Sequence, residues 1–525
     1  MTLGRSGKAT RVVAAAALAA AAVVWVAGPA QEPYARHTGR APNTHARHTG
    51  GVPNTHGSYT GGVPNIHGSR ASVDRRAPSI PGPSFLAGVV EGFYGPSWSV
   101  RDTLHMFRFM HQHDMNAFVY APKNDPYERV DWRQLYPASA WRTMRTLIAG
   151  ARANGIQFVY SISPGLSITY SSQTDRTLLI RKINQLRAAG VNTFMLSFDD
   201  ITGTLNHADA VRYGGNLARA QSSLADYVWR TERARDPQFR LLLAETMYFG
   251  TRDIPYWSGL KKYLLPAIEP IWTGPWVLSN SMTAAQVRAV ENDMGHRIVI
   301  WDNYPVNDFT YVVAHKPELF MGPLIGRAPG IPKLVAGYLF NPMLQARASE
   351  VALWTAASYL HNPAHYRPYA SWNAALKAIG GPAYADFRLF AENENSRYYD
   401  NLQPVLLARA VSAFWKQESV TRSLTDTLLY SQFHAMAAVN AALAQRLPDH
   451  ALYEEIAPFA QLLSFQGRLG MAAILAAQQE KRGALPAPQV RRLRSGLHEL
   501  QRNPDVIAGT VVESFVSRVL AQAGQ

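Results

Sequence analysis

The segment NTFMLSFDDITG, residues 192–203, joins a run of apolar residues to two adjacent aspartates, Asp199 and Asp200. A short and nearly continuous apolar run is typical of a strand that is buried on both faces, as in a parallel sheet. Such runs rarely end in neighbouring carboxylates, because like charges in contact oppose each other's ionisation. The segment therefore predicts a buried strand whose carboxyl end carries chemistry.

Seven other short apolar segments resemble this one, and amphipathic helical stretches separate them. The eight predicted strands are residues 86–95, 116–123, 157–164, 192–200, 240–248, 268–274, 297–304 and 333–342. Strands that alternate with helices favour a parallel sheet covered by helices, and eight such units match the usual size of a (β/α)8 barrel, roughly 250 residues. An open doubly wound sheet is the alternative, but no G-x-G-x-x-G motif opens any of the helices. We expect an α/β fold with a (β/α)8 TIM barrel catalytic domain over residues 85–362.

The pattern changes after the barrel. Residues 363–525 carry helical periodicity without a convincing strand, which predicts an all-α helical bundle as a C-terminal domain. The Met and aromatic positions of this region are expected to form its core.

The N-terminal 84 residues differ from the rest. A basic start, an apolar run at residues 12–26 and the small residues Gly28 and Ala30 predict a cleaved signal peptide over residues 1–30. The run is shorter than the roughly 20 residues of a typical span, so no stable membrane span is expected after cleavage; an uncleaved anchor is the alternative. The predicted location is secreted or cell-surface, that is, extracellular.

Residues 31–84 are expected to form a disordered linker. They hold three copies of an 11-residue unit rich in Gly, Pro, Thr and His, over residues 35–67, with almost no large apolar residue to bury. Weak metal binding by the five histidines of these copies is the alternative interpretation.

Composition excludes several function classes. The net charge of +15 is compatible with a polyanion, but no Lys/Arg run with interleaved aromatics stands out, so no nucleic-acid partner is expected. The chain has no cysteine, which excludes disulfides, thiolate metal sites and cysteine nucleophiles. The sequence indicates nothing about oligomeric state.

Polar and aromatic residues collect where the predicted strands end. In a parallel barrel these ends open on one face, where active sites are built. The residues include Gly92, Lys123, Asp199, Asp200, Tyr248, Trp301, Asn303, Asp308 and Asn341. Aromatic faces with amides and carboxylates are typical of sugar binding. As alternatives, an aspartate can cap the next helix, and Asp199, Asp200 and Asp302 could bind a divalent metal. No H-x-H or H-E-x-x-H motif accompanies them, so we expect no metal and no cofactor.

Two adjacent carboxylates suit a glycosidase mechanism in which the substrate supplies the nucleophile and each carboxylate has a different role. Glycosidases generally use two carboxylates that flank the scissile bond, but substrate-assisted families are exceptions. With an N-acetylhexosamine the acetamido oxygen attacks the anomeric carbon and forms an oxazoline. One carboxylate orients the acetamido group, and the other protonates the leaving oxygen and later deprotonates water.

Four motifs together resemble glycoside hydrolase family 84, the β-N-acetylglucosaminidases that include protein O-GlcNAcase and the clostridial enzymes once called hyaluronidases. They are GVVEGFYGPSWSVRDTLHMFRFMHQHDMNAFVYAPKNDPY (88–127), FMLSFDDI (194–201), WDNYPVNDF (301–309) and LFNPM (339–343). The resemblance runs in order from about residue 86 to 360 and continues more loosely through FAENENSR (390–397).

The resemblance implies a role for each matched residue. It assigns Asp199 to orienting the acetamido group and Asp200 to general acid/base catalysis, with Tyr248 beside the acetamido pocket and Trp301 as its wall. The residues implied in holding the sugar hydroxyls are Gly92, Lys123, Asn303, Asp308 and Asn341. Around the tyrosine the sequence departs from the family pattern Pro-Thr-Glu-Tyr, with Glu245 near the place of the proline and Met247 at that of the glutamate.

The expected function is an exported, retaining exo-β-N-acetylglucosaminidase that acts through an oxazoline without a metal. Its expected partner is a β-GlcNAc-containing glycan or glycoconjugate. An endo-acting hyaluronidase-type glycosidase is one alternative, and a non-catalytic carbohydrate-binding or adhesion protein is another.

Overall fold

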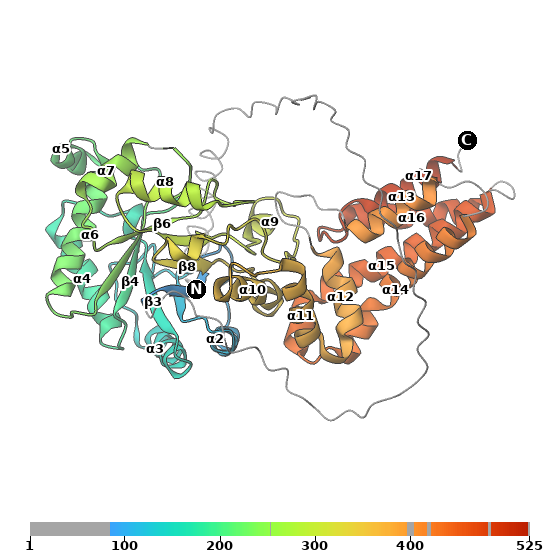
Figure 1. The fold of residues 1–525 in the computed structure, drawn as a ribbon, viewed down its shortest axis with the longest axis horizontal. Coiled ribbons are helices and arrows are strands. Elements are labelled where there is room, and N and C mark those ends of the chain that lie inside the picture. Colours follow the sequence, from blue (N-terminus) through green and yellow to red (C-terminus); the bar gives the residue numbers. More distant parts are fainter. Residues whose placement is uncertain (1–83, 253, 396–403, 417–421, 481–484, 523–525) are drawn as a thin grey trace, which may run out of the picture. The chain divides into compact units, whose positions relative to one another are not determined.

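The structure is a computed structural model that describes residues 84–252, 254–395, 404–416, 422–480 and 485–522 (Figure 1). The predicted signal peptide, residues 1–30, lies outside these ranges. So does the predicted linker, residues 31–84, except for its last residue.

Eight strands form a closed barrel in which each strand pairs in parallel with the next, and β1 pairs with β8. The strands are β1 Leu86–Glu91, β2 Ala117–Tyr120, β3 Gln157–Ile162, β4 Thr193–Ser197, β5 Arg240–Ala244, β6 Glu269–Trp272, β7 Val299–Asp302 and β8 Gly337–Phe340. Every strand lies within the segment predicted for it, so the prediction of a parallel eight-stranded barrel is confirmed.

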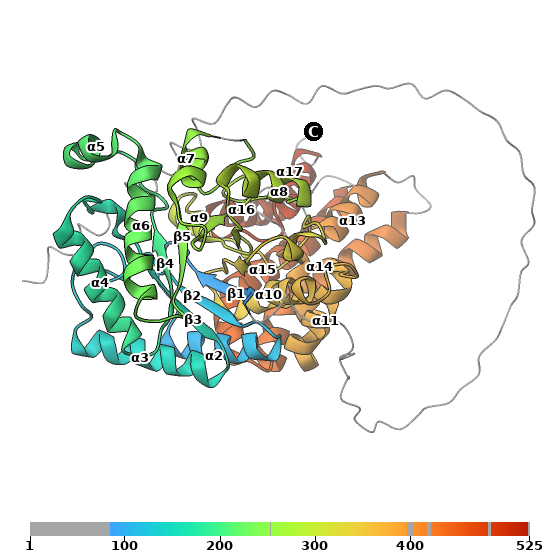
Figure 2. The same cartoon turned by 60° about the vertical axis from the view of Figure 1, so that its left-hand side comes forward.

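Helices follow the strands and surround the barrel (Figure 2). They are α2 Val100–Gln112, α3 Ala138–Ala153, α4 Gln173–Arg187, α5 His207–Tyr213, α6 Leu217–Arg233, α7 Pro255–Tyr263, α8 Ala284–Met294, α9 Asp308–Val312 and α10 Ala346–His361, with 3-10 turns η1 Pro164–Leu166 and η2 Ile331–Lys333. Several begin with a side-chain cap: the Ser99 hydroxyl, for example, accepts a hydrogen bond from the Asp102 N–H at 3.2 Å.

The strands are buried on both faces, and their side chains alternate between two cores. In β4, Met195 belongs to the cluster that fills the barrel interior, whereas Phe194 and Leu196 belong to the larger cluster between the strands and the helices. A strand presents successive side chains to opposite faces, so both positions must be apolar. This explains why the strand segments are continuous apolar runs rather than alternating ones.

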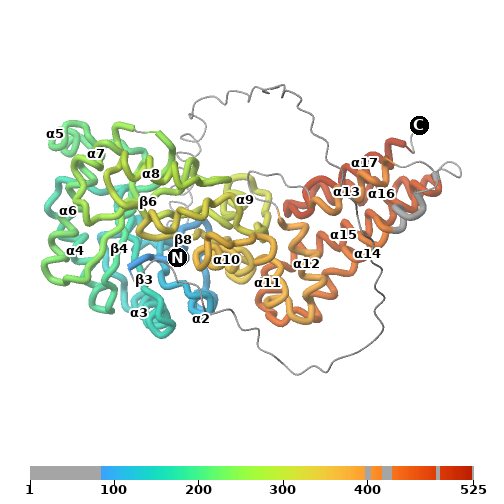
Figure 3. Tube along the Cα trace, in the orientation of Figure 1, coloured from blue at the N-terminus to red at the C-terminus, as the bar shows by residue number. Residues whose placement is uncertain are grey.

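The C-terminal region is helical, as predicted (Figure 3). Its elements are α11 Pro368–Gly380, η3 Gly381–Ala383, α12 Tyr384–Asn393, α13 Val405–Lys416, α14 Arg422–Arg446, α15 His450–Glu480, α16 Ala487–Arg502 and α17 Val511–Gln522. Leu, Phe, Met and Val side chains of these helices form a second core, which continues into the preceding domain through Leu319, Met343 and Val351. Among the described residues, no helix combines the length and the hydropathy needed to cross a bilayer.

Candidate active site

The two aspartates lie in the loop that leaves the carboxyl end of β4. The backbone of Asp200 has a φ of +54°, in the left-handed region that Asp tolerates better than most residues. The two side chains have entirely different partners.

Asp199 is buried and paired with a cation. The Lys123 ammonium, from the loop after β2, forms an ion pair with Asp199 Oδ2, and its side chain is only 5% exposed. Burial raises the pKa of Asp199, but the charges of Lys123 and Arg129 outweigh burial and bring the pKa below its ordinary value. The other oxygen, Oδ1, is buried and has no hydrogen-bond partner among the described residues. Asp199 is therefore an ionised carboxylate with one acceptor oxygen still available.

Asp200 is held by two phenols. Tyr94 Oη donates to Asp200 Oδ2 at 2.9 Å, and Tyr248 Oη donates to Asp200 Oδ1 at 2.7 Å. Burial and then the charge of Asp200 raise the pKa of both tyrosines well above 10, so both hydroxyls stay protonated and act as donors. This arrangement orients the carboxylate of Asp200 through both of its oxygens.

An amide and indole network forms a second part of the site. The Oδ1 atom of Asn303 accepts from Trp301 Nε1 and from Asn341 Nδ2, at 2.9 Å each. The Gly92 N–H donates to Asn341 Oδ1 at 3.3 Å. A Cβ on Gly92 would lie 2.1 Å from Cζ2 of Trp301, so only glycine lets the indole ring lie against this backbone.

Tyr94 and Lys123 connect these two parts. The Tyr94 N–H donates to Asp308 Oδ2 at 2.7 Å, and Lys123 Nζ lies 5.8 Å from the ring centroids of both Tyr94 and Trp301. Burial raises the pKa of Asp308 to about 6. Two backbone N–H groups donate to its carboxylate and lower the pKa, but burial has the larger effect. One connected set of contacts thus joins all nine residues singled out in the sequence, namely Gly92, Lys123, Asp199, Asp200, Tyr248, Trp301, Asn303, Asp308 and Asn341.

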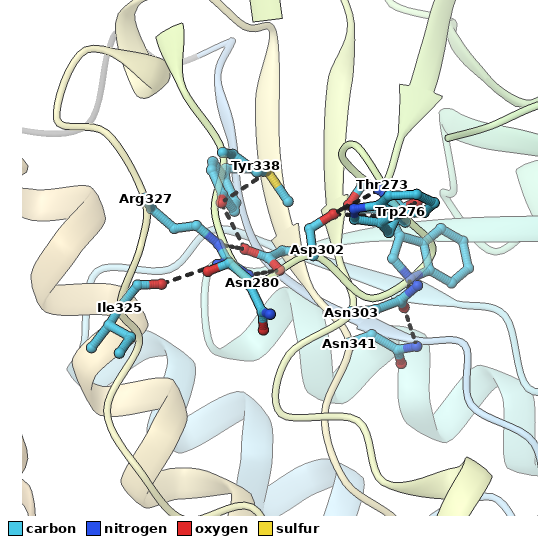
Figure 4. Close-up of polar contacts among 12 residues, drawn as sticks. Thr273, Trp276, Asn280, Asp302, Asn303, Ile325, Arg327, Tyr338 and Asn341 are labelled. Atoms are coloured by element: carbon cyan, nitrogen blue, oxygen red, sulfur yellow. Dashed lines mark hydrogen bonds and ion pairs between the residues drawn. The ribbon is translucent and has the colours of Figure 1, made fainter. Parts of the chain in front are cut away.

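Asp302, the residue before Asn303, forms a buried ion pair with Arg327 (Figure 4). Asp302, the last residue of β7, accepts from Arg327 Nε at 2.8 Å and Nη2 at 2.7 Å, and from Tyr338 Oη at 2.7 Å. The Arg327 side chain also donates to the carbonyls of Asn280 and Ile325. The Asp302 carbonyl accepts the Asn341 N–H at 2.8 Å, and Asn303 follows Asp302 in the chain, so the ion pair is connected to the backbone of both amide residues of the site.

Arg327→Lys is expected to lower the free energy of unfolding by about 2 kcal/mol, because lysine cannot reproduce a buried two-point contact with Asp302. Arg240→Lys is a matched control: Arg240 makes the same two-point contact with Glu269, at 2.7 and 2.9 Å, but both side chains are about one-fifth exposed. Chemical denaturation of both variants measures the difference. Equal losses at the two sites would contradict the role assigned to burial.

Four charged residues near the site are not among the nine site residues predicted from the sequence. Arg129 is 5% exposed, and its Nη1 and Nη2 atoms have no hydrogen-bond partner among the described residues. Glu128 is buried and accepts from the Ser161 and Ser163 hydroxyls, and its pKa is raised to about 7 by burial. Glu245, which departs from the family pattern, is buried beside β6 and accepts from the Ile271 N–H at 3.1 Å. Glu91 is the fourth of these residues.

Glu91 ends β1 and is 1% exposed. Its Oε1 accepts from the Trp98 N–H at 2.9 Å, yet burial raises the pKa of Glu91 from 4.5 to about 8. The folded protein therefore keeps this carboxyl protonated at a pH where the unfolded chain has released the proton. The stabilisation from this site is complete below about pH 4.5 and is lost as the pH rises through 8.

Glu91→Gln is expected to remove this pH dependence, because glutamine is neutral and still accepts from Trp98. Between pH 5 and 8 the unfolding free energy of the parent protein, relative to the variant, should fall by about 1.4 kcal/mol per pH unit. Denaturant titrations at several pH values measure the slope. Glu499→Gln, at an exposed position of α16, serves as the control, and parallel curves for parent and Glu91→Gln would contradict the protonated state.

The chain is similar to known proteins over the barrel and beyond. A family model described as beta-N-acetylglucosaminidase matches residues 87–392. The chain is 35% identical over 281 residues to protein O-GlcNAcase from Rattus norvegicus and from Mus musculus; the match covers 52% of this chain and 30% of each relative. The matched part of this chain therefore spans under a third of the length of these curated relatives.

Two solved structures are similar over most of the chain. An O-GlcNAc hydrolase mutant from Thermobaculum terrenum has a TM-score of 0.76 and 28% identity, covering 83% of this chain and 95% of that one. The protein named CpGH84B has a TM-score of 0.72 and 26% identity, covering 83% of this chain and 77% of its own.

Proposed function

The chain belongs to glycoside hydrolase family 84, the β-N-acetylglucosaminidases, and we propose that it removes terminal β-linked N-acetylglucosamine from glycans or glycoconjugates. The observation that carries the proposal is the contrast between two adjacent carboxylates. Asp199 is kept ionised by Lys123 and has a buried acceptor oxygen available, whereas Asp200 is oriented by two phenols. Groups with such different environments suit different chemical roles.

In the first step the substrate supplies the nucleophile. The acetamido oxygen bonds to the anomeric carbon as the bond from that carbon to the leaving oxygen breaks, and Asp200 gives its proton to the leaving oxygen. Positive charge develops on the acetamido group, whose N–H donates to Asp199. The free Oδ1 of Asp199 supports this assignment, because an ionised acceptor becomes more favourable as the N–H becomes more acidic.

In the second step water opens the oxazoline. Asp200, now ionised, takes a proton from the water as its oxygen bonds to the anomeric carbon, and the acetamido group is restored. Two displacements at one carbon return the original β configuration. The amide network of Asn303 and Asn341, with Lys123 and Asp308, has the donors and acceptors to hold the sugar hydroxyls during both steps.

A released-sugar assay with a chromogenic β-GlcNAc glycoside tests the proposal, run with and without chelator. We expect turnover that the chelator does not change, and a β-anomer as the first product in an NMR time course. No turnover would favour the non-catalytic carbohydrate-binding alternative, and an α-anomer would contradict the two-step mechanism.

We also propose that the enzyme acts at chain ends and is exported. The family resemblance supports exo action, and the sequence pattern of residues 1–30 supports export. Size analysis of digested hyaluronan separates exo from endo cleavage, and N-terminal sequencing of protein recovered from culture medium tests the predicted cleavage near Ala30.

A further inference from the structure

Trp276, in the loop after β6, differs from the other tryptophans of the described chain because its side chain is exposed, at 57%. A large apolar ring in water is unfavourable, roughly in proportion to its apolar area. Trp276 is not part of the hydrophobic core of the barrel, so packing of the core does not explain a tryptophan at this position. A single exposed ring is common on protein surfaces, so its meaning depends on where its loop lies relative to the active site.

The loop around Trp276 is held in place by hydrogen bonds (Figure 4). The Trp276 N–H donates to Ser279 Oγ at 3.1 Å, and its carbonyl accepts from Thr273 Oγ1 at 3.2 Å and from Ser279 Oγ at 3.0 Å. Gly274 has a φ of +115°, and a Cβ there would lie 2.3 Å from Ser279 Oγ. The backbone that carries the indole is therefore a turn with a defined, hydrogen-bonded conformation.

This turn is bonded directly to the candidate active site. The carbonyl of the next residue, Val277, accepts from Asn303 Nδ2 at 2.8 Å. At the other end of the loop, the Thr273 N–H donates to the Tyr248 carbonyl at 2.9 Å. The exposed ring therefore belongs to the face of the barrel on which the active site opens, one residue from a contact of the sugar-binding amides.

The segment that carries the ring has no charged side chain of its own. No Asp, Glu, Lys or Arg occurs from residue 270 to 287. An indole face on an uncharged loop suits the apolar C–H face of a neutral pyranose ring, because the loop supplies no charge of its own to attract the carboxylates of an acidic polysaccharide. A glycosidase that takes the terminal sugar into its pocket leaves the departing group at the rim, where Trp276 lies.

We infer that Trp276 forms an aglycone subsite for a neutral, β-linked sugar ring, so that the preferred substrate is an N-acetylglucosamine-capped oligosaccharide. This inference rests on the proposed function. It makes Trp276 a specificity-determining residue that acts on the departing sugar and leaves the chemistry at Asp199 and Asp200 unaffected.

The test compares kcat/KM on three substrates that share the terminal sugar: N,N′-diacetylchitobiose, methyl β-N-acetylglucosaminide and a neutral peptide carrying O-linked N-acetylglucosamine on serine. Trp276→Ala is expected to lower kcat/KM about tenfold on the disaccharide, the size of a lost ring contact, and less than about twofold on the methyl glycoside. Trp276→Phe should keep most of the activity on the disaccharide. Tyr369→Ala, at an exposed aromatic of α11, is the control and should change neither value.

Each other outcome contradicts a specific statement. Equal losses on the disaccharide and the methyl glycoside, or no loss on either, would overturn the subsite. A loss confined to the glycopeptide would overturn the sugar in favour of a peptide aglycone. No turnover of any of the three substrates by the parent protein would contradict the proposed function itself, and the subsite with it.

Discussion

Asp200→Asn is expected to lower kcat on an unactivated β-GlcNAc glycoside by about 10²–10⁴-fold, the usual contribution of general acid catalysis. An alkoxide is a poor leaving group, so its departure needs the proton that Asp200 supplies. The phenolate of an aryl glycoside can leave without that proton when the phenol is acidic. The first step with such a substrate should be far less affected. The side-chain amide preserves the shape of the carboxylate, and its oxygen can still accept from one of the two phenols, whereas its NH2 group meets the hydroxyl oxygen of the other as a donor.

Kinetics over a series of aryl glycosides with phenols of decreasing pKa measure this difference. The loss of activity should shrink steadily along the series. Added azide, which needs no deprotonation, should speed the turnover of activated substrates by the variant and give a β-glycosyl azide. Equal losses along the series, without any response to azide, would contradict the assignment of Asp200 as the acid/base. Tyr248→Phe, which removes one of the two phenols that hold Asp200, is expected to have a smaller effect, about tenfold.

The barrel was predictable because each strand is buried on both faces, so that burial leaves a continuous apolar run in the sequence. The ends of the strands were less predictable. The predicted segment 86–95 continues past Glu91, where β1 ends, because Phe93 is also buried and its ring packs against Trp98 at 5.8 Å between centroids. Buried residues that follow the end of the strand continue the apolar run in the sequence, although their backbone no longer pairs with a neighbouring strand.

The site was predictable to the extent that its polar residues interrupt apolar runs. Asp199, Lys123 and Asn303 stand where a buried strand gives way to a loop, and a shared face follows from the parallel topology. Arg129 had no such signal, because a charged residue in a turn-rich stretch normally indicates a solvated loop. That Arg129 is buried, with a charge that lowers the pKa of Asp199, follows only from how the loop after β2 folds back over the site.

The contrast between the two aspartates was also invisible in the sequence. Adjacent carboxylates with equal surroundings would share their protons as a coupled pair. The left-handed turn at Asp200 and the separate partners, a cation for Asp199 and phenols for Asp200, remove this equivalence. The division of roles therefore depends on tertiary contacts rather than on the Asp-Asp motif.

Asp199→Asn is expected to lower kcat by about 10²–10³-fold on activated and unactivated glycosides alike, as for the loss of one preorganised group that stabilises transition-state charge. The reason is that Asp199 acts on the nucleophile, which every substrate supplies from its acetamido group, and not on the leaving group. An asparagine oxygen still accepts a hydrogen bond, but it lacks the negative charge that balances the developing oxazolinium. The loss should therefore be constant over the aryl series in which the loss for Asp200→Asn shrinks.

Stability measurements separate this effect from a damaged fold. Asp199→Asn leaves the buried Lys123 ammonium without its counter-charge, so the melting temperature should fall. The double variant Asp199→Asn, Lys123→Met removes both charges and should recover much of that stability without recovering activity, because the acetamido group still has no anionic acceptor and the sugar hydroxyls have lost the Lys123 donor. If the loss for Asp199→Asn followed the leaving-group pKa instead, the roles of the two aspartates would be exchanged. If activity returned with stability in the double variant, the carboxylate of Asp199 would serve the fold rather than the reaction.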